Sequence, residues 1–67
     1  MNDIQNQTAE SIIERNGTSA LNKIQASSEL NISRSKLDEL RKSGELKYKM
    51  VGGQVRISAY SVAEMVA

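Results

Sequence analysis

Two adjacent glycines divide an alternating stretch, YKMVGGQVRIS, over residues 48–58. On either side of Gly52 and Gly53, apolar residues alternate with basic or polar ones, which is the period-two pattern of a half-buried strand. Glycine readily adopts the positive φ angles that a tight turn of type I′ or II′ requires. The stretch therefore predicts a β-hairpin, and in a chain of only 67 residues this hairpin must form a large part of the fold.

The hairpin admits two registers. A two-residue turn pairs Lys49 with Arg56 on one face, whereas a three-residue loop that includes Gln54 would turn Lys49 inward. The two-residue turn gathers an apolar set on the other face, to pack on the helices: Tyr48, Met50, Val55 and Ile57. It fits the alternation better, although like charges directly across a ladder are unfavourable. We expect this register, either in a plain hairpin that closes a small core or beside a phosphate that offsets the two charges.

The chain contains no cysteine and no histidine. It therefore has no disulfide, no thiolate zinc ligand and no imidazole that could serve as a ligand, acid or base. A domain this small also has little room for a cleft of the several hundred cubic ångströms typical of small-molecule sites. We therefore expect that the protein is not an enzyme and that it binds neither a cofactor nor a metal ion.

Hydrophobic runs never exceed three residues, so no membrane-spanning segment is expected. The stretch MNDIQNQTAE has neither the basic region nor the apolar core of a signal peptide, which indicates a cytoplasmic protein. Residues 1–31 carry two basic and four acidic side chains, whereas residues 32–67 carry seven basic and four acidic ones. The second part is therefore the side that attracts a polyanion.

Residues 1–20 are expected to form an extension outside the main domain. Thr8 is predicted to cap a short helix over residues 9–15, with residues 1–7 frayed. Only Ile12 and Ile13 supply an apolar face, and two turns are too few for a stable isolated helix. This segment must dock on the domain, self-associate through the two isoleucines, or remain disordered.

Capping signals predict two consecutive helices in the main domain, residues 21–67. Asn22 precedes a helix over about 23–30, and Ser33 precedes one over 34–43 that ends at Gly44. Three or four residues join these helices, which is the spacing of a helix-turn-helix.

Two other segments complete the domain. The stretch NGTSA before Leu21 is predicted to be a loop, and Ser58 is a candidate cap for a last helix over 59–66. Together with the hairpin, these elements predict an α+β fold, a small winged helix-turn-helix.

The second helix of the pair begins with the acid-free sequence SRSK. In proteins that read the major groove, the N-terminal residues of the recognition helix reach base edges, and arginine can bind guanine with two hydrogen bonds. Asp38 and Glu39, predicted to face solvent, would repel phosphate if the helix lay along the groove. Both carboxylates are compatible with DNA binding if the helix enters the groove by its N-terminal tip. Glu39 could then accept a hydrogen bond from a cytosine amino group.

The run LNISRSKLDELRKSGELKYKMVGGQVRISAYSVAEMVA resembles the excisionase-type, MerR-like winged helix-turn-helix modules of phages, plasmids and transposons. The shared features are a turn that ends in Ser33, a basic helix, the Gly-Glu-Leu exit at residues 44–46, and a glycine-containing wing before Val55-Arg56-Ile57. The resemblance covers residues 21–67.

The resemblance implies a helix in the major groove of double-stranded DNA and a wing on the adjacent minor groove or backbone. It also implies an architectural role in which the protein bends DNA and directs an integrase or recombinase toward excision, or else a transcriptional role. Residue chemistry and resemblance together predict these DNA contacts: Ser33, Arg34, Ser35, Lys36, Glu39, Lys42, Lys49, Gln54 and Arg56.

The sequence also departs from that family. Asp38 and Glu39 replace an aromatic and a basic residue, and Arg41 replaces an apolar one. Lys23 and Ile24 invert the usual order of apolar and polar residues, and the family pattern favours the three-residue hairpin loop. A protein-interaction adaptor with the same fold is the alternative function.

Overall fold

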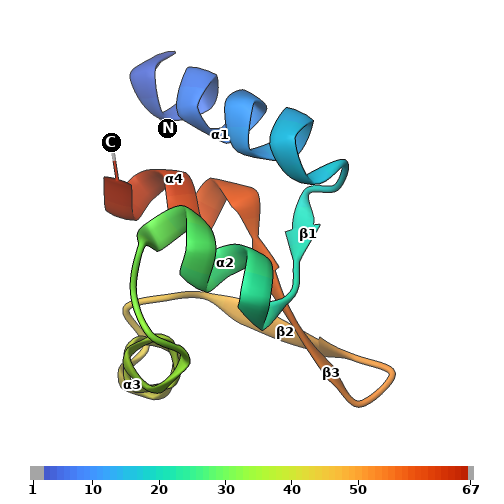
Figure 1. Cartoon of the computed structure of the whole chain (residues 1–67), viewed down its shortest axis with the longest axis vertical. Coiled ribbons are helices and arrows are strands. Elements are labelled where there is room, and N and C mark those ends of the chain that lie inside the picture. Colours follow the sequence, from blue (N-terminus) through green and yellow to red (C-terminus); the bar gives the residue numbers. More distant parts are fainter. Residues whose placement is uncertain (1–2, 67) are drawn as a thin grey trace.

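The computed structural model describes residues 3–66, which form four helices and a three-stranded antiparallel sheet with strand order β1-β3-β2 (Figure 1). In chain order the elements are α1 (Asp3–Asn16), β1 (Ala20–Leu21), α2 (Lys23–Leu30), α3 (Arg34–Ser43), β2 (Tyr48–Val51), β3 (Gln54–Ser58) and α4 (Ala59–Val66). This confirms the expected α+β fold, in an arrangement consistent with a winged helix-turn-helix. None of the helices in the described residues is long and apolar enough to cross a membrane.

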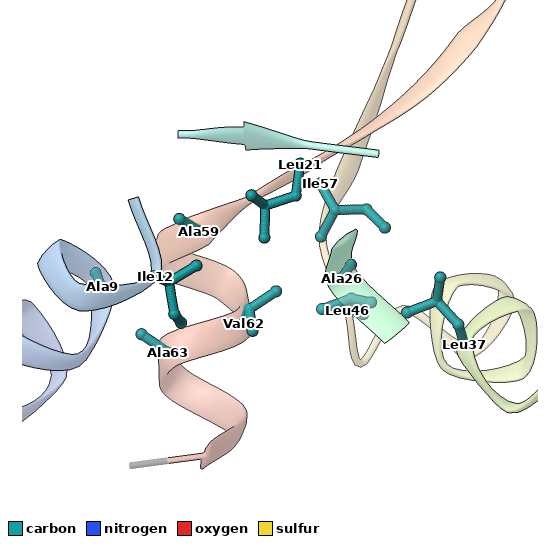
Figure 2. Packing of buried hydrophobic residues seen from close by; sticks show 10 residues of the cluster. All are labelled: Ala9, Ile12, Leu21, Ala26, Leu37, Leu46, Ile57, Ala59, Val62 and Ala63. Carbon is teal, nitrogen blue, oxygen red and sulfur yellow. The ribbon is translucent and has the colours of Figure 1, made fainter. Parts of the chain in front are cut away.

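One hydrophobic cluster joins all the helices to the sheet. Figure 2 shows its ten buried members: Ala9, Ile12, Leu21, Ala26, Leu37, Leu46, Ile57, Ala59, Val62 and Ala63. Leu37 is the buried residue of α3, and Leu46 lies in the segment that leads from α3 to β2. Because both are essentially inaccessible to solvent, they hold α3 and the base of the hairpin on the same core.

α1 is longer than predicted. It begins at Asp3, and Thr8 lies inside it, where its hydroxyl donates to the Ile4 carbonyl at 2.9 Å instead of capping the helix. α1 runs along α4 (Figure 1), and Ile12 is buried against the core with 1% of its surface exposed. Tertiary packing of this face extends the helix beyond its local signals. Residues 3–7 are therefore helical, contrary to the prediction, and residues 1–2 lie outside the described residues.

Of the three alternatives for the N-terminal segment, the structure shows docking on the domain. It gives no support to self-association through Ile12 and Ile13, because Ile12 is buried inside the molecule and Ile13 packs partly against the same core. A salt bridge fixes the end of α1: Arg15 Nη2 lies 2.5 Å from Glu29 Oε1 on α2. The amide of Asn16 donates to the same carboxylate at 3.0 Å. The N-terminal segment is thus an integral part of the fold.

The predicted caps of the helix-turn-helix are confirmed. Asn22 and Gln25 form a reciprocal capping box, in which each side chain accepts from the other residue's backbone N–H, at 2.7 and 3.0 Å. Ser33 Oγ accepts from the Lys36 N–H at 3.1 Å, and Gly44 ends α3 with a φ of 84°. Local hydrogen bonding therefore sets the start of both helices.

The predicted hairpin register is also confirmed. Lys49 pairs with Arg56 and lies exposed, and Gly52 and Gly53 have φ angles of 58° and 79°, as a two-residue turn requires. The three-residue loop favoured by the family pattern is wrong for this chain. Its glycines occupy both turn positions with positive φ, so no third residue is needed.

Two other predictions about the sheet fail. The loop expected before Leu21 instead ends in β1, which pairs with β3 through Ala20–Ser58 and Leu21–Ile57. The apolar hairpin face does not pack wholly on the helices, because Ile57 is fully buried whereas Met50 is 58% exposed. The hairpin extends beyond the core (Figure 1), so only its base is covered.

Candidate nucleic-acid interface

α3 and the hairpin lie on the same side of the molecule, with α2 between them and α1 (Figure 1). The four residues of the predicted tip, Ser33 to Lys36, are all exposed. Ser33 adopts an extended conformation, with φ −71° and ψ 161°, so the helix starts abruptly and the following side chains project from its first turn. This end of α3 is free to approach a ligand.

Both carboxylates on α3, Asp38 and Glu39, form ion pairs with basic side chains. Asp38 Oδ1 lies 3.1 Å from Arg41 Nη2 and 3.3 Å from Lys23 Nζ on α2. The hydrogen bond from Arg41, followed by that from Lys23, outweighs desolvation and lowers the pKa of Asp38. Asp38 keeps 34% of its side chain exposed, so it faces away from the core as predicted, but these two cations hold its carboxylate. Glu39 lies at the surface, 3.5 Å from Lys36 Nζ. These pairs reduce the repulsion that either carboxylate would exert on phosphate.

Arg41 also contacts the hairpin. Its guanidinium lies 4.7 Å from the centre of the Tyr48 ring on β2, and its side chain is only 14% exposed. A guanidinium can stack on an aromatic ring while it keeps its hydrogen bonds. At this usually apolar position, Arg41 therefore bridges the helix and the strand.

A shallow hollow of about 380 Å³, open to solvent and not an enclosed cleft, lies between the helices and the hairpin. Its lining residues, which define the helix–hairpin hollow, are Asn22, Lys23, Ile24, Arg34, Gln54, Val55 and Arg56. It brings together three predicted contacts, Arg34 from α3 and Gln54 and Arg56 from β3. The predicted set omitted the other four lining residues, Asn22, Lys23, Ile24 and Val55, although the unusual order of Lys23 and Ile24 was a signal in the sequence.

A second hollow, of about 530 Å³, lies on the sheet face that carries Lys49 and Arg56. Its basic lining residues are Lys47, Lys49 and Arg56, and none of its lining residues is acidic. Arg56 belongs to both hollows, and its guanidinium donates to Gln54 Oε1 and to the Val55 carbonyl. Lys42, in the last turn of α3, lines neither hollow.

Ion pairing divides the basic side chains of residues 3–66 into two groups. Four have carboxylate partners within the chain: Arg15, Lys23, Lys36 and Arg41. The others form no such pair, and we call them the basic surface: Arg34, Lys42, Lys47, Lys49 and Arg56. All five lie on α3, the hairpin or the segment between them, whereas α1 exposes Asp3, Glu10 and Glu14. The unpaired positive charge is therefore concentrated around the two hollows.

A capped pair of short helices with a β-hairpin beside the second helix is the arrangement of a helix-turn-helix domain. Comparison with protein families agrees, because the family model described as a helix-turn-helix domain matches residues 21–67. The chain belongs to this family, which supports a DNA-binding protein rather than an enzyme. Searches of curated proteins and of solved structures found no match to the chain.

Proposed function

We propose that the protein is a sequence-specific double-stranded DNA-binding accessory factor. The first turn of α3 enters the major groove, and the hairpin contacts the adjacent minor groove or backbone. The observation that supports this proposal most directly is the helix–hairpin hollow, which is lined by Arg34 of the helix tip together with Gln54 and Arg56 of the hairpin. The unpaired basic surface around it supplies the attraction to phosphate.

The proposed contacts fall into two groups. Arg34 reads a guanine, with Ser33, Ser35, Lys36 and Glu39 bonding to nearby base edges or phosphates. Lys42, Lys49, Gln54 and Arg56 position the protein on the backbone. The Lys49–Arg56 rung has no anion of its own among the residues of its hollow, which supports a phosphate as its partner.

The resemblance to excisionase-type modules supports a more specific role. In this role the protein bends DNA at a recombination site and directs an integrase or recombinase toward excision. Regulation of transcription in a phage or plasmid would use the same surface. Footprinting on the DNA that flanks the gene, combined with an excision assay with the neighbouring recombinase, separates the two roles. Excision that proceeds equally well without the protein would contradict the recombination role.

Salt dependence tests the binding surface. If about four phosphates are contacted, log K should fall against log salt with a slope near −3.6. Gel-shift titrations between low and moderate salt measure this slope. Arg15→Gln removes one positive charge from α1, away from α3 and the hairpin (Figure 1), and should leave the slope unchanged; thermal unfolding checks that this variant is folded without the Glu29 pair. A slope near zero for the unaltered protein would contradict the proposal.

A further inference from the structure

Ile24 is an exposed hydrophobic side chain that lines the helix–hairpin hollow together with charged and amide side chains. It is the second residue of α2, and 62% of its surface is accessible. The core-facing side of α2 is supplied by Ala26 and Ser27 instead, so the packing of the fold does not explain Ile24. It contributes little to the core, and the hollow that it lines is also lined by three predicted DNA contacts, Arg34, Gln54 and Arg56.

The surroundings of Ile24 narrow the chemistry of its partner. The helix–hairpin hollow places it with Lys23, Arg34, Gln54 and Arg56, and its other apolar side chain is the partly buried Val55. Cationic and amide groups suit phosphates and base edges. An isoleucine side chain contributes favourable binding free energy only when its surface and that of an apolar partner are both removed from water. In the major groove, the 5-methyl group of thymine is the apolar feature of the base edges.

We propose that Ile24 is a specificity-determining residue that contacts a thymine methyl group beside the base read by Arg34. This inference rests on the proposed DNA-binding function and extends it to the first helix of the helix-turn-helix. The first helix would then read sequence, in addition to positioning the protein on the backbone. The preferred site should contain a thymine whose methyl group contributes to affinity.

The test isolates that methyl group. Duplexes that bind the full chain are first selected from a random pool, and each thymine of the best one is then replaced singly by deoxyuridine. At one position, loss of the methyl should weaken binding about fourfold, which is about 0.8 kcal/mol for a buried methyl-sized group at 1.4 kcal/mol per tenfold. Ile24→Ala should bind the thymine and deoxyuridine duplexes equally, and Ile24→Val should retain part of the difference.

Met65→Ala is the matched control, because Met65 is also an exposed apolar residue, 40% accessible, but lies on α4 and lines neither hollow. This variant should discriminate between the two duplexes as the unaltered protein does. The inference is overturned if the unaltered protein binds every deoxyuridine duplex as tightly as the thymine duplex. It is also overturned if Ile24→Ala keeps the discrimination, as a protein-docking role for Ile24 would allow. Failure to select any duplex would instead contradict the proposed function itself.

Discussion

The two ends of this molecule differ in how many of their basic side chains are paired with carboxylates. Around α1, Arg15 is paired with Glu29 and contributes to joining two helices. Around α3 and the hairpin, Lys36 and Arg41 are paired, but the five side chains of the basic surface have no carboxylate partner among residues 3–66. Whether basic residues are paired therefore identifies a binding surface better than their number does. A paired cation has already been neutralised within the fold.

The core side chains of α1 should produce the largest effect on stability. Ile12→Ala should lower the free energy of unfolding by about 2–5 kcal/mol, because it leaves a cavity between α1 and α4. Urea denaturation followed by circular dichroism measures this loss. Ile4→Ala, at a residue 67% exposed on the same helix, should change stability by less than about 0.5 kcal/mol. Equal effects of the two variants would show that α1 is not docked as described.

The basic surface should behave in the converse way, with large effects on binding and small ones on stability. Arg34→Ala should cost about 1–3 kcal/mol of discrimination at one base position. Arg56→Ala should weaken binding on all sequences and reduce the salt slope by about 1. Gel shifts on a panel of single-base variants measure both changes, and thermal unfolding checks that the variants are folded. If both variants bind every duplex as the unaltered protein does, the assignment of these residues is wrong.

The smallest expected effect is on the pH dependence of stability, through Glu29, the carboxylate that pairs with Arg15 of α1. The hydrogen bond from Arg15 is the main cause that lowers the pKa of Glu29 below its ordinary value of 4.5. The stabilisation is therefore fully present above that value and is lost as pH falls through the lower pKa of the folded state. Urea denaturation at pH 7 and at pH 3 should show a smaller decrease in stability for Glu29→Gln than for the unaltered protein.

Glu10→Gln is the control for this experiment, because Glu10 is exposed on α1 and has no ion pair among the described residues. Its pH dependence should match that of the unaltered protein. If Glu29→Gln also matches, then the pairing of Arg15 with Glu29 contributes nothing to stability in solution.

Much of the fold follows from short-range signals. The capping residues Asn22 and Ser33 set the starts of α2 and α3, and adjacent glycines set the hairpin register, as predicted. These features depend on hydrogen bonds and φ angles within a few residues, so a single sequence is enough to read them. The same local signals therefore predict the tip of α3 and the hairpin as the candidate site.

Other features depend on contacts between segments distant in the chain. α1 extends beyond the residues that its capping signals predicted, because it packs along α4. β1 forms because Ala20 and Leu21 pair with β3. Asp38 is held by Lys23 across the helix-turn-helix, and Met50 is exposed because the hairpin extends beyond the core. None of these outcomes follows from local periodicity, since each requires a partner element in a particular place.

The sequence by itself determined the helix-turn-helix, the hairpin register and the chemistry of the helix tip, because these rest on local backbone preferences. Only the tertiary structure decided which side chains share the helix–hairpin hollow. It added Lys23 and Ile24 of α2 to Arg34 and to the hairpin residues. The physical reason is that burial and ion pairing are set by packing around a common core, which joins residues that are far apart in the chain.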